Sequence, residues 1–323
     1  MRRVRLAAAM LALAMAACSP PKPPPKPGDL LAWAYPGGPP TAFPSTAPGP
    51  HTVPGSAITL TGAQIDDEHA PPDWFPDEHP PAPASVAHGH AGGPIVCAAC
   101  HLMNGQGFIG APNLSGLPAA YIVKQVQAFR NGQRTSWQKP RPDTDEMIKA
   151  AQGVTDPELR EAAAYFAGLP RRAWVRVVEA DKVPVTKPNP LGWQDLVPGG
   201  GVEPIAGRII EVPEDTARTF LSDPHSGLVI YVPAGSIARG AALVKSGGAG
   251  GQPCASCHGA DLRGAGEVPS LAGRSAAYLA RMLWDIKTGA RGGPDVAPMA
   301  IPTKGLSEAN IIDVVAYLAS LKP

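Results

Sequence analysis

The sequence carries almost no net charge, with 28 lysines and arginines against 27 aspartates and glutamates. It contains no basic stripe and no recognisable nucleic-acid-binding motif, so nucleic-acid binding has no support. The charge balance also gives no reason to expect electrostatic steering toward a strongly charged partner. After the first residues, no segment is long and apolar enough to span a bilayer as a helix. Cysteine is scarce as well, with five in 323 residues, and their positions are the most informative feature of the chain.

Four of the five cysteines lie in two copies of one motif, Cys-Ala-Ala-Cys-His at 97–101 and Cys-Ala-Ser-Cys-His at 254–258. Cys-x-x-Cys-His is the attachment sequence of a c-type haem. The two thiols add to the two vinyl groups of one haem, and the adjacent histidine binds the iron. On a helix, these three side chains share one face. The sequence therefore predicts two covalently attached c-type haems, held by Cys97, Cys100, His101, Cys254, Cys257 and His258.

Other interpretations of these cysteines are weaker. A zinc ribbon places its two cysteine pairs about 15–20 residues apart, whereas Cys100 and Cys254 are far apart in this chain. A thioredoxin-like dithiol needs no histidine directly after it, and no βαβ pattern surrounds either motif. Two structural disulfides, Cys97–Cys100 and Cys254–Cys257, remain as the simplest alternative for an exported chain.

The first residues resemble an export signal. Three arginines precede a short apolar stretch at 6–14, which is too short to span a membrane. The stretch ends in Met-Ala-Ala-Cys18, which resembles a bacterial lipoprotein signal and implies cleavage after residue 17 and lipid modification of Cys18. An ordinary signal peptide that leaves a free Cys18 is the alternative. In a Gram-negative bacterium, Ser19 after the cysteine would imply sorting to the outer membrane, with the protein at the periplasmic face.

Residues 18–84 are rich in proline, which favours extended polyproline II over a helical core. We expect the first part of this extension to be a tether between the lipid anchor and the folded body. Its later part contains aromatic residues that are unusual for a linker, and these are expected to pack along that body. The nearby His88-Gly-His90 sequence is only a weak indication of a metal site. The aromatic residues are Trp33, Tyr35, Phe43, Trp74 and Phe75.

The two haem motifs belong to a longer internal repeat. The loop Pro-Asn-Leu-Ser-Gly at 112–116 matches Pro-Ser-Leu-Ala-Gly at 269–273, and each begins 15 positions after the first cysteine of its motif. After one gap of five residues, Met147 matches Met299, and each lies 18 positions before a tyrosine. A repeat of this length indicates a domain duplication.

Each repeat is expected to be mostly helical. Apolar residues recur at helical spacing after Tyr121 and after Tyr278, and Thr155 and Ser307 are suitable N-cap residues for a last helix. Each repeat resembles a class I cytochrome c domain, and the tandem arrangement resembles the dihaem cytochrome c4-like family. The resemblance implies one cytochrome c domain at residues 85–170 and a second at 233–323.

The same resemblance implies histidine and methionine as axial ligands of both irons. Matching positions make Met147 and Met299 the sixth ligands, each in a methionine loop. The backbone carbonyls of Pro112 and Pro269 would hold the imidazole N–H of the proximal histidines, which fixes the rings. Rivals for the first haem are Met103, His88 and His90, while Met282 is expected to be a core residue of the middle helix.

The segment 171–232 between the repeats is expected to be a connector that packs against both units. Short β-branched runs at 175–178, 208–212 and 227–232 predict strands. His225 is interpreted as structural. The second unit has a complete first helix at 235–244, whereas the first unit has only residues 85–89 in that place, so its helix must be short or absent.

The favoured function is transfer of single electrons between redox partners, with no catalytic side chain, because the chemistry belongs to the cofactor. A haem whose two axial positions are filled does not readily bind substrate, and an axial methionine raises its reduction potential. Two alternatives stay open. In the first, the chain would be the electron-accepting subunit of a dehydrogenase. In the second, one haem would have an open axial position and would serve in an enzyme or a sensor.

Overall fold

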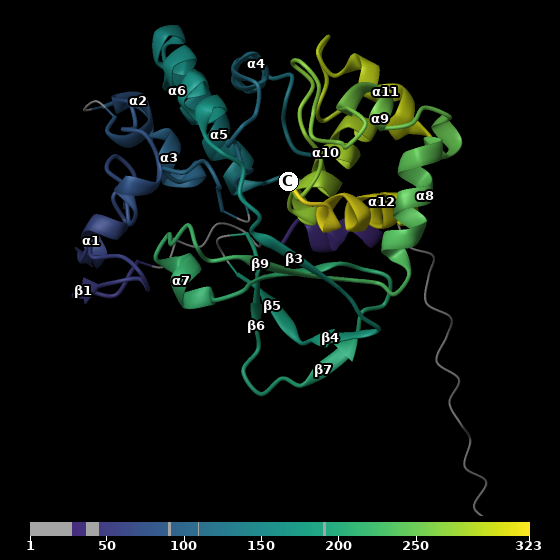
Figure 1. Ribbon diagram of the computed structural model, residues 1–323, viewed down its shortest axis with the longest axis horizontal. Helices are drawn as coiled ribbons and strands as arrows, with labels where there is room; N and C mark the ends of the chain where they lie inside the picture. Colours follow the sequence, from purple (N-terminus) through teal and green to yellow (C-terminus); the bar gives the residue numbers. More distant parts are fainter. Residues whose placement is uncertain (1–27, 37–44, 90–91, 109, 190–191) are drawn as a thin grey trace, which may run out of the picture.

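The computed structural model describes residues 28–36, 45–89, 92–108, 110–189 and 192–323. The expected signal peptide, Cys18, Phe43 and His90 lie outside these residues. Two groups of helices stand side by side above a layer of short strands (Figure 1). Within the described residues, no helix is long and apolar enough to cross a bilayer.

The first helical unit contains the first haem motif. Its middle helix, α4, packs against α5 and α6. Thr155 caps α6, as the sequence predicted, and it forms a capping box with Glu158. The elements of this unit are α2 (Ala84–Ala87), α3 (Cys97–His101), α4 (Ala119–Arg130), α5 (Pro142–Gly153) and α6 (Asp156–Gly168).

The second helical unit contains the second motif and repeats this arrangement with a longer first helix. Helix α8 packs along α12, and α10 packs against α11 and α12. Ser307 caps α12 in a capping box with Asn310, and Gly289 ends α10 in the left-handed conformation that glycine favours. The elements are α8 (Ser236–Ser246), η3 (Gly248–Gly250), α9 (Ala255–His258), α10 (Ala276–Thr288), α11 (Ala297–Lys304) and α12 (Glu308–Ser320).

Matching backbone hydrogen bonds are present in the two units. Gly107 N donates to His101 O over 2.9 Å, and Gly264 N donates to His258 O over the same distance. Further along, the glycine that ends each Pro-x-Leu-x-Gly loop donates to the last helix of its unit, again over 2.9 Å in both. The two loops are therefore held in the same way. The second pair of bonds joins Gly116 N to Phe166 O and Gly273 N to Leu318 O.

The expected methionine loops are wrong in their local structure, because both methionines lie on helices. Met147 is in α5, whose first turn carries Pro142 and the acidic Asp143 and Asp145. Proline suits the first turn of a helix, and acidic side chains there complement the helix dipole. Met299 lies near the start of α11. The short α2 agrees with the expectation of a clipped first helix in the first unit.

The segment between the units forms a small sheet in the order β3-β9-β8, with β3 parallel to β9 and β8 antiparallel to it. These strands coincide with the three runs that predicted them. The two further ladders, β4 with β7 and β5 with β6, were not predicted. The elements are β3 (Val175–Glu179), β4 (Lys182–Pro184), β5 (Thr186–Pro188), β6 (Gln194–Leu196), β7 (Val202–Pro204), β8 (Ile210–Pro213), α7 (Thr216–Phe220) and β9 (Leu228–Val232).

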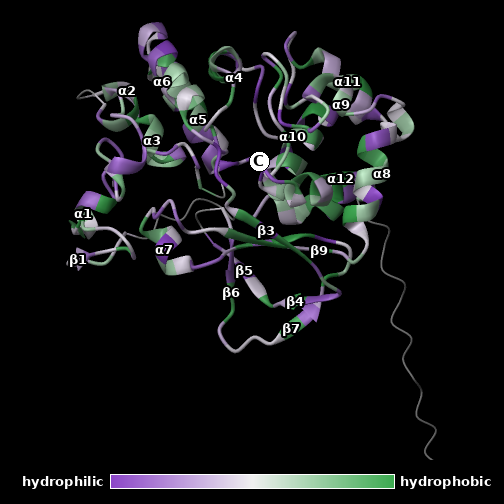
Figure 2. Cartoon of the chain, in the orientation of Figure 1, coloured by the Kyte–Doolittle hydropathy of each residue, from purple (hydrophilic) through white to green (hydrophobic). Residues whose placement is uncertain are grey.

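The main core joins this sheet to the second unit. Leu228, Ile230 and Val232 on β9 are buried in one cluster with residues of α10 and α12. Figure 2 shows the same continuity, with hydrophobic residues concentrated on β3, β9 and α12. A separate cluster around Phe166 forms the core of the first unit. The connecting sheet thus supports the second unit from below (Figure 1).

The described part of the N-terminal extension is packed against the second unit and the connecting segment. Leu31 and Ala34 are fully buried against the second unit, and Trp74 is buried in a cluster that includes Phe75 and Leu221. The expectation that the aromatic residues pack along the folded body is confirmed for those described. The elements are η1 (Asp29–Ala34), β1 (Pro50–His51), β2 (Leu60–Thr61), α1 (Gly62–Ile65) and η2 (Pro76–Glu78).

Candidate functional site

His101 ends α3 with its ring fixed by a backbone carbonyl. Its Nδ1 lies 2.9 Å from Pro112 O, which is the contact that the resemblance implied. Burial lowers the pKa of His101 to about 4, against the opposing effect of this hydrogen bond. The ring is therefore neutral, with Nδ1–H donating to the carbonyl. The lone pair of Nε2 is left available for a metal.

His258 ends α9 in the same arrangement. Its Nδ1 lies 2.8 Å from Pro269 O, and burial lowers its pKa. Its Nε2 is buried and has no hydrogen-bond partner within the described part of the chain. A buried nitrogen without a hydrogen-bond partner costs free energy unless another group binds it. This atom is therefore suited to be a ligand of a haem iron.

The cysteines of both motifs are unpaired thiols, which does not support the disulfide alternative. Burial raises the pKa of Cys97 to about 11. Burial, with the nearby carboxylates of Glu68 and Asp143, raises the pKa of Cys100 to about 12. Both thiols of the first motif are therefore neutral in the folded chain. One turn of helix presents them beside His101, as the motif predicted.

A cavity of about 560 Å³ opens beside the first motif. Cys97, Cys100 and His101 line it together with Met147 and the apolar side chains of α4 and α6. Its wall also includes residues of α10 and of the connecting segment, so it lies between the first unit and its neighbours. The volume, the apolar lining and the two thiols next to an available imidazole nitrogen fit a covalently held haem.

Met147 is thus brought to the cavity of the first motif, whereas two of its rivals are not. Among the described residues, neither Met103 nor His88 lines this cavity, and Met103 is buried in the core of the first unit. Met282, which we expected in the core, lines the cavity instead, with its sulfur 3.1 Å from Arg134 Nη2. Cavity lining therefore favours Met147 as the sixth ligand over Met103.

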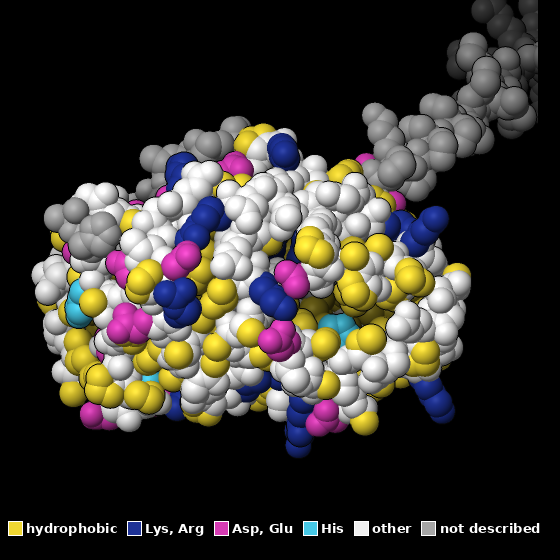
Figure 3. Space-filling model, turned by 90° about the horizontal axis from the view of Figure 1, so that it is seen from above, with side chains coloured by type: hydrophobic (Ala, Val, Ile, Leu, Met, Phe, Trp, Pro, Cys, Tyr) yellow, Lys and Arg dark blue, Asp and Glu magenta, His cyan; other side chains and the backbone are white. Residues whose placement is uncertain are grey.

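The second unit carries a recess on the upper face of the molecule. Figure 3 shows a histidine side chain in a hollow that hydrophobic side chains surround, on the side of the second unit. Met299 is half-buried at the start of α11, which packs against α10 and η3. Ile301 on the same helix is exposed, so this side of the second unit presents apolar surface to solvent.

Two arginines meet between the units, at matching positions of the repeat. Arg134 and Arg291 pair as an antiparallel bridge, and both side chains are buried. Their guanidiniums share Gln125 Oε1, at 2.9 Å and 2.7 Å. Arg291 also donates to the hydroxyl of Tyr121 over 3.1 Å. These partners are neutral, so the pair fits the carboxylates that a haem carries.

Tyr278, the counterpart of Tyr121, has a pKa that reflects the positive charge of the arginines between the units. Burial alone would raise its pKa, but the guanidiniums of Arg134, Arg291 and Arg274 lower the pKa to about 8. The repeat places these tyrosines and arginines at matching positions, 157 residues apart in each pair, but the sequence alone assigns them no role. Polar residues that match in both repeats, at positions where burial is expected, were the available signal.

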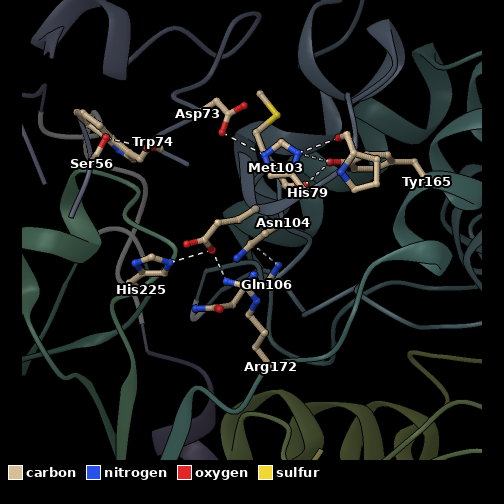
Figure 4. Close-up of polar contacts among 12 residues, drawn as sticks. Ser56, Asp73, Trp74, His79, Met103, Asn104, Gln106, Tyr165, Arg172 and His225 are labelled. Atoms are coloured by element: carbon tan, nitrogen blue, oxygen red, sulfur yellow. Dashed lines mark hydrogen bonds and ion pairs between the residues drawn. The ribbon is translucent and has the colours of Figure 1, made fainter. Parts of the chain in front are cut away.

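The loop after His101 is fixed by the N-terminal extension. Tyr165 donates to Met103 O over 2.7 Å and lies 3.1 Å from His79 Nδ1. His79 Nε2 in turn lies 3.1 Å from Asp73. Figure 4 shows Asp73, His79 and Tyr165 in a row, with Met103 beside His79. The extension therefore contributes to the rigidity of the first candidate haem site.

His225, interpreted as structural, lies in the same region. Its ring stacks on Phe75 with 3.9 Å between ring centroids, and its Nε2 is 3.0 Å from Glu78. Glu78 also pairs with Arg172. Among the described residues, no group of three or more histidine, cysteine, aspartate or glutamate side chains is arranged to hold a metal ion.

The comparisons with known proteins agree with this geometry. The family model Cytochrome c matches residues 95–170 and 237–322, one segment for each motif. Cytochrome c-554(548) from Halomonas halodenitrificans is 38% identical over 73 residues, 22% of this chain and 82% of that protein. Cytochrome c4 from Azotobacter vinelandii is 36% identical over 83 residues, 24% of this chain and 37% of that protein. The thiosulfate dehydrogenase electron acceptor from Thiomonas intermedia is 25% identical over 227 residues, 69% of this chain and 77% of that protein.

Proposed function

Because the chain belongs to the cytochrome c family, we propose that it is a dihaem protein that transfers single electrons between redox partners. The observation that carries the proposal is the pair of matched histidines. Burial lowers the pKa of each, and each has Nδ1 held by a proline carbonyl. When bound, each haem supplies a one-electron couple.

The residues of each motif have separate roles in this proposal. Cys97 and Cys100 hold the first haem covalently, and Cys254 and Cys257 hold the second. His101 and His258 are the proximal ligands. The carbonyls of Pro112 and Pro269 keep the rings oriented and increase the basicity of the ligating nitrogens.

Met147 and Met299 fill the sixth positions in this proposal. A filled sixth position keeps substrates from the iron, and a thioether ligand favours the reduced state and thus a higher potential. The shared cavity supports Met147, and the matched position in the repeat supports Met299. Arg134 and Arg291 would neutralise the haem carboxylates between the units.

We also propose that the protein is exported and held by a lipid on Cys18 at the periplasmic face of a bacterial membrane. The apolar stretch at 6–14 and the cysteine at its end support this placement. Covalent haem attachment outside the cytoplasm is consistent with it. Mass spectrometry of the mature N-terminus tests it, since an unmodified residue 18 or an uncleaved signal would contradict the anchor.

An optically followed redox titration, with haem quantified against protein, tests the main proposal. We expect two haems per chain, low-spin spectra, a far-red methionine–iron band and two one-electron midpoints. One haem per chain, or carbon monoxide binding by the reduced protein at neutral pH, would instead indicate an empty or open site. The enzyme or sensor alternative would then replace the carrier.

The match to the Thiomonas intermedia protein supports a more specific candidate, because it spans 69% of this chain and therefore more than one unit. We propose that the donor is a dehydrogenase that oxidises thiosulfate. Stopped-flow mixing with such a purified enzyme and thiosulfate should reduce both haems within its turnover time. Reduction no faster than by thiosulfate alone would contradict this donor without affecting the role as a carrier.

A further inference from the structure

One buried arginine joins the two loops that hold the proximal histidines. Arg274 Nε donates to Ser270 O over 2.6 Å, and its Nη2 donates to Ser270 Oγ over 3.0 Å. Its Nη1 donates to Asn113 O over 2.8 Å. Ser270 directly follows Pro269, and Asn113 directly follows Pro112. A single guanidinium therefore contacts both loops at equivalent positions of the repeat.

The repeat itself does not explain this contact. The residue that corresponds to Arg274 in the first unit is Leu117, so the cation is present on one side only. Arg274 is 4% exposed, and burial lowers its pKa. No carboxylate of the described residues forms an ion pair with it; its hydrogen bonds are to neutral oxygens. The buried positive charge is therefore not cancelled by an adjacent anion.

A second arginine strengthens the connection between the loops. Arg171, which follows the first unit, donates to Ala272 O in the second loop over 2.6 Å. Its side chain also lies over Gly116 in the first loop, where a Cβ would be 2.8 Å from its Cγ. Arg171 reaches from the start of the connecting segment to the second loop, and Arg274 reaches from the second unit to the first loop. The two loops are consequently fixed to each other.

We propose that Arg274 is a positioning residue that couples both proximal histidines and, as a buried cation, raises the reduction potentials of both haems together. The proposal rests on the proposed ligation of the two irons by His101 and His258. A positive charge opposes the additional charge of the oxidised iron, and the effect is strong where water is excluded. Displacement of either loop would also move the carbonyl that orients its histidine.

The test is a redox titration of three variants of the haem-loaded full chain. In Arg274→Gln, the charge is lost while part of the side-chain hydrogen bonding is kept. We expect both oxidised-to-reduced equilibria to shift by about tenfold toward the oxidised form, which is about 59 mV for one electron. Arg274→Lys keeps the charge, so the oxidised-to-reduced equilibria of both haems should stay within about twofold of the wild type. Its unfolding temperature should fall, because an ammonium group cannot replace the hydrogen bonds that the planar guanidinium donates to both loops. Arg176→Gln is the control, since Arg176 is an exposed cation on the connecting sheet.

The outcomes separate this proposal from the proposed function. A wild-type protein without two haems would contradict the proposed function, whatever the variants do. Two normal haems in Arg274→Gln with unchanged potentials, or with only the second haem shifted, would overturn the coupling. An equal shift in Arg176→Gln would mean that net charge, not position, is responsible. If neither Arg274 variant acquires its haems, Arg274 is needed for formation of the haem-loaded protein, and the proposed effect on the reduction potentials is wrong.

Discussion

Arg134 and Arg291 face each other across the two helical units as an antiparallel bridge, although both carry buried positive charge. Burial lowers the pKa of Arg134, and the charge of Arg291 lowers it further. Such a pair is costly unless an anion or a polar network compensates for it. Gln125 and Tyr121 supply neutral partners, so the contact between the units is polar at its centre.

Removal of one member of this pair should weaken the haem-loaded protein more than removal of an exposed ion pair between the same units. Arg134→Gln removes the hydrogen bonds that the buried guanidinium donates to Gln125 and Met282, and a hydrogen bond of a charged group contributes about 1.5–3 kcal/mol. Lys124→Gln, the control, removes exposed pairs with Glu267 and Asp295, which contribute little because solvent screens them. Denaturant unfolding measures both. Equal losses would mean that the buried pair has no special role in holding the units together.

Met147→His should lower the potential of one haem without loss of either. Histidine in place of the thioether gives two imidazole ligands, which favour the oxidised iron relative to methionine ligation. We expect the far-red methionine–iron band to fall by about half, because one of two such ligands is replaced. Met103→Leu is the matched control, since Met103 is buried outside the cavity. If the control loses the band and Met147→His keeps it, the ligand assignment is wrong.

The haem motifs and the repeat could be predicted because they depend on residues close together in sequence or on a fixed spacing. The His101–Pro112 contact, 11 positions apart, belongs to this class. The contact of Arg274 with Asn113 joins residues 161 positions apart, and no local pattern identifies such a partner. The ladders β4–β7 and β5–β6 were missed because their strands are three residues long and three of the four contain proline, which ordinarily counts against a strand.

The helices that contain Met147 and Met299 show a second limit of prediction from the sequence. Pro142 and two aspartates at the start of α5 are ordinary helix-start signals, but the resemblance to a loop outweighed them in the prediction. Packing of Val126, Phe129 and Ala151 between α4 and α5 then fixes the helix. Tertiary contacts of this kind decide between two conformations that the local sequence allows.

We expect the stability of the protein to depend on pH through the protonation of His79. Its hydrogen bond to Asp73 is the main cause that raises its pKa above the ordinary value of about 6.5. Its other ring nitrogen lies 2.9 Å from Pro80 O, so both nitrogens face acceptors and favour the charged ring. A group whose pKa is raised by folding stabilises the protein fully below its unfolded pKa. That contribution is lost as the pH rises through the folded value.

The expected result is therefore a free energy of unfolding that declines above pH 6.5 more steeply in the wild type than in Asp73→Asn. The variant cannot hold the charged ring by an ion pair, so its profile should be flatter over that interval. Thermal or denaturant unfolding at a series of pH values measures the difference. Parallel profiles of the two proteins would show that the His79–Asp73 pair does not titrate in this range.

The N-terminal extension should contribute to the stability of the protein through Leu31 more than through the adjacent Leu30. Leu31 is 0% exposed against the core of the second unit, whereas the adjacent Leu30 is 42% exposed. Glu308 accepts hydrogen bonds from Gly28 N and Leu30 N, and alanine at position 30 or 31 keeps these backbone contacts. Leu31→Ala should lower the free energy of unfolding by about 2–5 kcal/mol, because it leaves a cavity in the core. Leu30→Ala should change it by less than about 0.5 kcal/mol. If denaturant unfolding gives the two variants the same stability, the extension is not part of the cooperative fold.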